Sequence, residues 1–368
     1  MKQYLESLQR IVNIGLSLPD RTKVGRVKVF GTQERYDLKN SFPLVTTRQI
    51  FTKGMINETL WFIRGETNVK TMGGTKIWDN WAVREEDVTS YVGDMVKDET
   101  DVPEGYKEQL AIHLQDEIGN IGPMYGAMWR NAPITETRSY PHRTLDQLPS
   151  DKLKIYTEEY EELMVLSKPE YPLTLEQFAN RRYWQSIDQL NELLINLRER
   201  PYSSRHCITA WIPEYVPDET KSPQANVLDG KGALSACHAF FQFMVLGGQE
   251  PGDRKRLSCQ LYIRSSDAAI GKPTNIAQYA LLTKMIAQVV DMDADELIFT
   301  SGDSHIYTNH LEANGAKEGI ETQLQREPLP PPTLWLNPEV KDLFKFTPED
   351  IRIENYQYHP RIDYPIAV

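Results

Sequence analysis

Cysteine is scarce in this sequence. The 368 residues include three cysteines, Cys207, Cys237 and Cys259, with neither a CxxC pair nor a cluster of Cys and His. An odd number of cysteines without paired spacing argues against a disulfide framework and against a structural zinc site. We therefore expect no metal, a reducing compartment and free thiols, any of which is available for catalysis.

Long apolar runs and excess positive charge are also lacking. The apolar runs are far shorter than the ~18 residues of a membrane span, and MKQYLESLQRIVNIGLSL is typical of an amphipathic helix instead of a signal peptide. Lys and Arg number 41 against 52 Asp and Glu, a net charge of −11. A dedicated nucleic-acid binder usually needs a basic face, whereas a small anionic ligand needs positive charge only at its own binding site. We expect no membrane or nucleic-acid partner and a cytoplasmic location, the host cytoplasm for a viral protein.

Periodic patterns predict both helices and strands. Alternating or continuous apolar runs indicate strands, and apolar residues at helical spacing indicate helices. The expected elements are a helix at the N-terminus, a strand at Val27–Phe30, a helix over 50–64, strands in HAFFQFMVLGG and LSCQLYIRSSD, and a helix over 275–291 capped by Thr274 or Asn275.

Three polar stretches interrupt this pattern, at 82–120, 134–185 and 216–232. Their weak periodicity and, in the last, their Pro and Gly content are typical of surface loops, so we interpret them as insertions. No repeat or flexible linker divides the chain. The predicted fold class is α+β, as a single domain over 1–368 with a large mixed β-sheet flanked by helices.

Cys237 is the first candidate for chemistry. It lies in LSACHAFF at the start of a predicted buried strand, with His238 beside it. A thiolate attacks far better than a thiol, so a catalytic cysteine needs nearby positive charge. The alternative is a small core residue, the commoner role of a buried cysteine. Cys259 fits that alternative because it lies on the apolar face of its strand, and the core role is also favoured for Cys207.

Arginines near hydroxyl groups suggest a phosphate site. Arg21 lies in LPDRTKVG, Arg205 in PYSSRHCITAW, and Arg264 stands next to Ser265. Guanidinium and hydroxyl groups together commonly hold a phosphate monoester, although a single arginine is more often a solvated surface charge. Arg264 departs from that alternative because its strand carries little other charge. Its face is opposite the apolar one, so we expect it to point into a cavity.

Acidic and aromatic residues add candidates for proton transfer and hydrogen bonding. Glu58 lies in MINETLWFIRG among large apolar residues, where burial would raise its pKa toward neutrality; an exposed Glu is the equal alternative. The segment GDSHIYTNH contributes Asp303, His305 and Tyr307. Because no carboxylate-rich ligand set accompanies its two histidines, we favour hydrogen-bonding roles over a metal site.

In this order, the motifs resemble those of the thymidylate synthase family. The matching segments are DRT, FPLVTTR, NETLWFIRGETN, KIWDNWA, GPMYGAMWR, SSRHCITAW, ACHAFFQF, LSCQLYIRSSDAAIGKPTNIAQYALL, GDSHIYTNH, REPLPPP and the terminal PIAV. They extend from one end of the chain to the other and leave out the three polar stretches. The resemblance implies that dUMP and 5,10-methylenetetrahydrofolate are the substrates and that the protein is a homodimer.

The resemblance also implies roles for residues at matching positions. Cys237 would be the nucleophile that adds to C6 of the pyrimidine, Glu58 the proton relay, and Asn275 the amide that binds the uracil edge. The implied phosphate ligands are Arg21, Arg264, Ser265 and, across the dimer interface, Arg205. The other implied nucleotide contacts are His238, His305 and Tyr307, the last two at the 3′-hydroxyl. Tyr125 and Asp267 match residues around the proton transfers and the pterin. The implied folate contacts are Ile77, Trp78, Trp81, Asp267, Ile270 and Gly271, with Val368 in the tail that closes the site.

Three positions depart from the family pattern. His206 stands where a second phosphate-binding arginine is usual, Ile263 replaces Gln, and Thr274 replaces Phe. The first change bears on phosphate affinity, with a histidine contact as the expectation, and we expect the other two to touch the wall of the site.

Two other activities stay open. A hydroxymethylase of the same family would capture the exocyclic methylene with water and release tetrahydrofolate. Asn275 favours uracil over the cytosine of dCMP, and Trp78 at the pterin site favours hydride transfer. A non-catalytic, degenerate relative is the third hypothesis, and the intact set of Cys237, Glu58, Asn275 and Tyr307 speaks against it.

Overall fold

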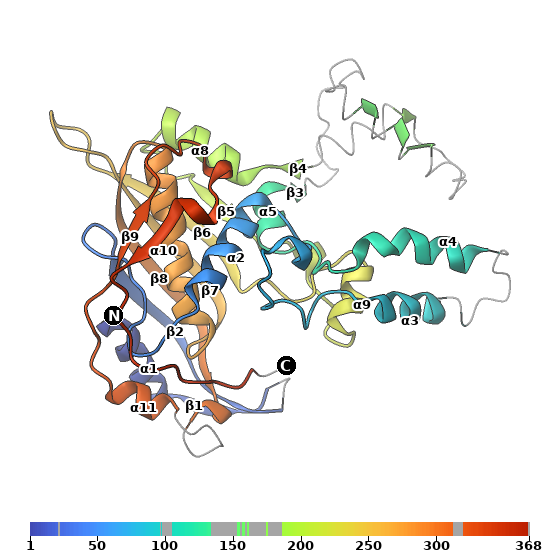
Figure 1. The fold of residues 1–368 in the computed structure, drawn as a ribbon, viewed down its shortest axis with the longest axis horizontal. Helices are drawn as coiled ribbons and strands as arrows, with labels where there is room; N and C mark the ends of the chain where they lie inside the picture. The colour runs from blue at the N-terminus through green and yellow to red at the C-terminus, as the bar shows by residue number, and fades with distance from the viewer. Residues whose placement is uncertain are drawn as a thin grey trace.

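A six-stranded sheet forms the centre of the molecule (Figure 1). The computed structural model describes residues 1–20, 23–95, 97, 105–133, 186–311 and 319–366, with 153–154, 157–158, 160–161 and 174–175 between them. The strands of the sheet, in spatial order, are β1 (Leu16–Leu18), β2 (Arg26–Asp37), β8 (Asp293–Tyr307), β7 (Arg256–Asp267), β6 (His238–Leu246) and β5 (Cys207–Thr209). Neighbouring strands are antiparallel except β7 and β8, which are parallel. This mixed sheet in one domain agrees with the predicted fold class.

Helices cover one face of the sheet. The long helix α10 (Gly271–Val289) connects β7 to β8 and packs on both, and α1 (Lys2–Ile14) packs on β2. The other α-helices whose bounds fall within the described residues are α2 (Thr52–Arg64), α3 (Glu85–Met95), α4 (Tyr106–His113), α5 (Gly126–Arg130), α8 (Gln189–Glu199), α9 (Pro223–Leu228) and α11 (Ile320–Gln325). The short 3₁₀ helices are η1 (Val69–Thr71), η2 (Leu114–Glu117), η4 (Pro213–Tyr215), η5 (Thr308–His310), η7 (Leu343–Lys345) and η8 (Pro348–Asp350). Two small sheets pair β3 (Ala132–Pro133) with β4 (Ser186–Ile187) and β9 (Thr333–Leu336) with β10 (Ile351–Glu354).

The alternation of β7 is as the sequence predicts. Leu257, Cys259, Leu261 and Ile263 are each 0% exposed on the helix-covered face, which confirms Cys259 as a core residue. Burial of such side chains removes apolar surface from water and is the main favourable contribution to folding.

The predicted cap of the long helix is wrong. The helix begins at Gly271, with Ile270 at the N-cap and no side-chain hydrogen bond from it. Instead, Asp267 at the end of β7 accepts hydrogen bonds from the backbone N–H groups of Ala269 (2.9 Å) and Ile270 (3.1 Å). Thr274 and Asn275 therefore lie inside the first turns of α10, beyond the cap position.

Two of the predicted insertions contain ordered helices that pack together. The first stretch holds α3 and α4, which extend side by side away from the sheet (Figure 1), and the third holds α9. The Tyr91 hydroxyl of α3 donates a 2.7 Å hydrogen bond to Asp229 beside α9. The stretch 134–185 lies almost entirely outside the described residues. That these stretches are insertions stays a prediction.

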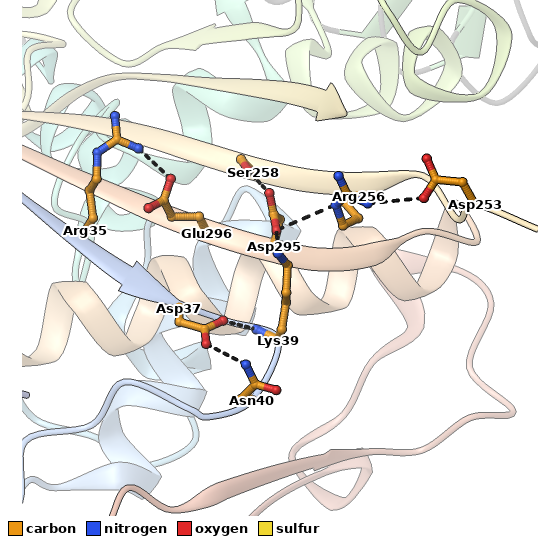
Figure 2. A network of polar contacts seen from close by, with 9 residues as sticks. All are labelled: Arg35, Asp37, Lys39, Asn40, Asp253, Arg256, Ser258, Asp295 and Glu296. Atoms are coloured by element: carbon orange, nitrogen blue, oxygen red, sulfur yellow. Dashed lines mark hydrogen bonds and ion pairs between the residues drawn. The ribbon is translucent and has the colours of Figure 1, made fainter. Parts of the chain in front are cut away.

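The start of β7 and of β8 carries a network of charges (Figure 2). Asp295 accepts a 3.1 Å hydrogen bond from Ser258 and lies 2.6 Å from Lys39 and 3.9 Å from Arg256. Partly exposed ion pairs of this kind contribute little individually. Polar groups that could take part in a reaction lie at the opposite, carboxyl ends of these two strands.

Candidate active site

A cavity of about 270 Å³ opens at the carboxyl ends of β7 and β8. Residues from the sheet, α2, α10 and the loops around them converge on it. Its lining residues are Arg26, Glu58, Phe62, Trp78, Tyr125, Cys237, His238, Ser265, Asp267, Gly271, Asn275, His305 and Tyr307. All of them except Arg26 and Phe62 are residues that the sequence had singled out as site candidates.

Cys237 lies immediately before β6. Its backbone N–H donates a 3.2 Å hydrogen bond to the Tyr125 hydroxyl, and its Sγ lies 4.0 Å from the guanidinium of Arg264. Burial raises the pKa of the Cys237 thiol, and the charge of Arg264 and the Tyr125 hydroxyl oppose that rise. Arginine is thus the nearby cation that favours the thiolate, the reactive form of cysteine.

Arg264 forms hydrogen bonds to the loop that carries Cys237. Its guanidinium donates to the carbonyl groups of Ala236 (3.4 Å) and Ser235 (3.3 Å), and it lies 5.4 Å from the ring centre of Trp211. It is not among the residues that line the cavity. In this structure the side chain contacts the wall behind the thiol and does not point into the cavity as expected.

Glu58 is buried on α2, so the exposed alternative is wrong. Its two carboxylate oxygens accept hydrogen bonds from the Trp78 indole N–H (2.7 Å) and from Gln278 Nε2 (2.6 Å). Burial raises the pKa of Glu58 to about 7, although both hydrogen bonds act to lower it. A carboxyl group with this pKa gains and loses a proton readily near neutral pH.

Gln278 connects Glu58 to Asn275, and the sequence predictions missed it. Its Oε1 accepts a 3.0 Å hydrogen bond from Asn275 Nδ2. Only its position three residues after Asn275, on the same side of a helix, hinted at this contact. Because Asn275 donates through Nδ2, its amide oxygen is left for a donor in the cavity or for His238.

Tyr125 and His238 form an aromatic wall with Phe62. Tyr125 has φ of +38°, a conformation that costs a non-glycine residue energy, and its ring centre lies 4.8 Å from that of His238 and 5.0 Å from that of Phe62. Burial lowers the pKa of His238 to about 4, against the hydrogen bond with Asn275, so the imidazole is neutral at physiological pH. His238 is therefore a polar wall residue without charge.

The parallel pairing of β7 and β8 brings the remaining polar groups together. Asp267 pairs in register with His305, and Ser265 pairs with Asp303. His305 Nδ1 lies 3.3 Å from Asp303 Oδ1, and the His305 and Tyr307 ring centres are 5.2 Å apart. A hydroxyl group, an imidazole and a phenol thus line the cavity from adjacent strands.

An indole surface borders the cavity on the α2 side. Trp78 lines it, and the ring of Trp81 packs edge-on against Trp78 with 5.6 Å between centres. Ile77, next to them, is 41% exposed, and Ile270 begins the turn that leads to Gly271. These apolar groups offer an aromatic, partly open surface that could contact a planar ring system.

Several predicted residues either do not line the cavity or fall outside the described residues. Arg21 and Val368 are outside the described residues, and Arg205 is exposed and does not line the cavity. His206 is 1% exposed, and its Nε2 hydrogen-bonds to the carbonyl groups of Arg200 (3.1 Å) and Pro201 (3.0 Å). This burial leaves His206 no surface for a phosphate, so the expected histidine contact is corrected to a structural role.

The other two departures also lie away from the wall. Ile263 is 0% exposed in the core, and neither it nor Thr274 lines the cavity. The expectation that they touch the site is not met by the described structure.

Within the described part of the chain, no group of three or more His, Cys, Asp or Glu is arranged to hold a metal ion. In the same part, no helix is both long and apolar enough for a membrane crossing.

Together, the mixed sheet and this cavity define a single-domain α/β protein whose site is centred on a buried cysteine and a buried carboxyl group. The sequence model of thymidylate synthase matches residues 2–368. The chain therefore belongs to the thymidylate synthase family, a family of methyltransferases whose members use methylenetetrahydrofolate, bind dUMP and typically form dimers.

Proposed function

We propose that this chain is a thymidylate synthase, which converts dUMP and 5,10-methylenetetrahydrofolate to dTMP and dihydrofolate. The observation that carries the proposal is that Cys237, Glu58 and Asn275 line one cavity. A thiol, a carboxyl group with a pKa of about 7 and an amide are the groups needed for covalent addition to a uracil ring.

Cys237 is the nucleophile in this proposal. Its Sγ adds to C6 of the uracil, and the electron pair of the C5–C6 double bond makes C5 enolate-like and able to form a bond to a one-carbon unit. Arg264, 4.0 Å from Sγ, stabilises the thiolate before the attack. The hydrogen bond from Cys237 N–H to the Tyr125 hydroxyl, 3.2 Å long, holds the attacking loop in place.

Glu58 and Asn275 act on the base. The amide oxygen of Asn275 has two lone pairs, so it can accept a hydrogen bond from the uracil N–H beside its contact with His238, while its Nδ2 donates to Gln278. Glu58 exchanges a proton with the base carbonyl through water, at a pKa of about 7 that suits either direction of transfer. Loss of the C5 proton would expel the folate nitrogen from the transferred carbon and leave an exocyclic methylene at C5, with Cys237 still bonded to C6. Addition of a hydride to that methylene re-forms the C5–C6 double bond and expels Cys237 as the thiolate.

The cavity wall fits a folate ring. The bound folate would supply the one-carbon unit and a hydride. Trp78 provides the aromatic surface, and its hydrogen bond to Glu58 fixes the indole, while Trp81 packs behind it. An indole held by these contacts would keep water away from C5, which favours a methyl product over a hydroxymethyl product.

A second copy of the chain completes the site. The uncovered face of the sheet exposes large apolar side chains, among them Phe240 (39%), Met244 (50%), Leu246 (45%) and Tyr262 (39%). An apolar sheet face of this kind favours association, and the family resemblance implies that twofold pairing brings Arg205, which is exposed in the single chain, to the partner's cavity. Arg205 is then a phosphate ligand of the neighbouring subunit.

A product assay tests the proposal. The purified protein is incubated with dUMP and 5,10-methylenetetrahydrofolate, and both products are identified by mass. dTMP and dihydrofolate in equal amounts are the expected result. Hydroxymethyl-dUMP with tetrahydrofolate would instead identify the hydroxymethylase, and nucleotide binding without any product would identify a non-catalytic relative.

A further inference from the structure

The described lining of the cavity carries little positive charge. Among the described residues that line it, Glu58 and Asp267 are acidic, and Arg26 is the only lysine or arginine. A nucleoside monophosphate brings about two further negative charges into this space. Since unpaired charge in a confined site is costly, the phosphate needs guanidinium or ammonium partners.

Two positions of the family's phosphate site do not line the cavity in the described structure. Arg264 faces backbone carbonyl groups behind Cys237, and the second arginine of the usual pair is replaced by the buried His206. Arg26 enters from β2, where it pairs in register with Tyr307 of β8. Its guanidinium carbon lies 5.7 Å from the Tyr307 ring centre.

Two carboxylates hold Arg26 from behind. Its Nε lies 3.3 Å from Asp20 Oδ2, and its Nη1 lies 3.7 Å from Asp303 Oδ2. Neither aspartate lines the cavity, so both orient the guanidinium without occupying the ligand space. Asp303 also lies 3.5 Å from Lys28, so Lys28 balances part of the Asp303 charge. The Arg26 side chain is 19% exposed, so it is restrained and still open to a ligand.

We propose that Arg26 is a phosphate ligand of the nucleotide, supplied by the same subunit as Cys237, and that it compensates for the arginine missing at His206. This inference rests on the proposed function. The planar guanidinium has five N–H donors, and the loose carboxylate contacts leave its edge suited to a bidentate contact with phosphate oxygens. Ser265, which also lines the cavity, adds a hydroxyl group.

Binding measurements with Arg26→Gln test the assignment. Calorimetry gives the Kd of dUMP, and competition gives the affinity of inorganic phosphate. Both are expected to weaken by about 10- to 100-fold, the loss typical of one charge-assisted contact. Arg26→Lys is expected to lose less, because it keeps the charge but not the fork. Arg35→Gln is the matched control, since Arg35 lies on the same strand and pairs with Glu296 at the surface.

The outcomes distinguish a phosphate ligand from a sugar contact and from a structural residue. A loss for dUMP with unchanged affinity for inorganic phosphate would overturn the assignment in favour of a sugar contact. Equal weakening in Arg35→Gln, or a lowered melting temperature that Arg26→Lys does not restore, would overturn it in favour of a structural role. Unchanged dUMP binding in Arg26→Gln would overturn this inference and leave the proposed function unaffected. A wild-type protein that binds no dUMP overturns the proposed function and this inference with it.

Discussion

Gln278 Nε2 donates a 2.6 Å hydrogen bond to Oε2 of Glu58, although 220 residues separate them along the chain. The same amide accepts from Asn275. Gln278 therefore connects the residue proposed to bind the base with the residue proposed to move the proton. We therefore expect a change at Asn275 to affect Glu58, and the reverse, through the Gln278 side chain.

Replacement of this amide is expected to move the pH profile. The Gln278 hydrogen bond lowers the pKa of Glu58, so Gln278→Met should raise that pKa above about 7. The inflection of kcat/KM assigned to Glu58 should shift to higher pH by the same amount. Gln288→Met is the control, because Gln288 lies on the same helix and donates to the backbone carbonyl groups of Asn337 and Val340. An inflection that shifts equally in both variants contradicts the proposed contact.

Glu58 should also make stability depend on pH. The unfolded carboxyl ionises near its ordinary value of 4.5 and the folded one near about 7, so the folded protein binds the extra proton between these values. Stability relative to Glu58→Gln is therefore greatest below pH 4.5 and declines as the pH rises through about 7. The total change is about 3 kcal/mol. Urea unfolding of both proteins at about pH 5 and about pH 8 measures it; a difference that grows with pH would contradict the sign.

Loss of the nucleophile should abolish turnover. Cys237→Ser is expected to reduce kcat by at least about 10³-fold while dUMP still binds, because the hydroxyl is a far weaker nucleophile at neutral pH. Cys207→Ser is the matched control, since Cys207 lies outside the cavity. Rates come from the product assay and affinities from calorimetry. Near-normal turnover in Cys237→Ser would end the mechanism.

Shared sites should be visible by complementation. Arg205→Ala and Cys237→Ser subunits are each expected to be inactive or strongly impaired as homodimers. Mixed after reversible dissociation, they should recover activity, because one site in each heterodimer has an intact Cys237 and an intact partner Arg205. Sedimentation gives the oligomeric state alongside the activity. A fully active monomer would rule out the shared site.

A buried ion pair between α10 and β2 should show strong energetic coupling. Lys272 is 0% exposed, and its Nζ contacts Glu34 (2.8 Å) and the Ser7 hydroxyl (2.7 Å). Lys272→Leu alone leaves Glu34 buried without its cation and should cost about 3–5 kcal/mol of unfolding free energy. The double variant Lys272→Leu with Glu34→Leu should recover most of that loss. Denaturant unfolding of the four proteins in the cycle gives the coupling; additive losses would show that the pair does not interact.

Local patterns were sufficient for much of the fold. The alternation of Leu257, Leu261 and Ile263 predicted both the strand and its buried face, since side-chain direction in a strand repeats every two residues. The apolar neighbours of Glu58 likewise indicated the helix, although they left its burial undecided. The cap of α10 was missed because the backbone groups there are satisfied by Asp267, which belongs to the preceding strand.

The sequence by itself determined which residues are candidates for chemistry, because thiol, carboxyl, amide and guanidinium groups are fixed by residue type and their motifs occur in the order of the family pattern. Tertiary structure alone decided which of them meet. The parallel register of β7 and β8 places Asp267 beside His305, and the packing of α2 on α10 buries Glu58 against Gln278. It also turned His206 into the interior and aimed Arg26 at the cavity. Periodicity reports the environment of a residue relative to its near neighbours, whereas these contacts depend on strand register and helix packing between segments distant in the chain.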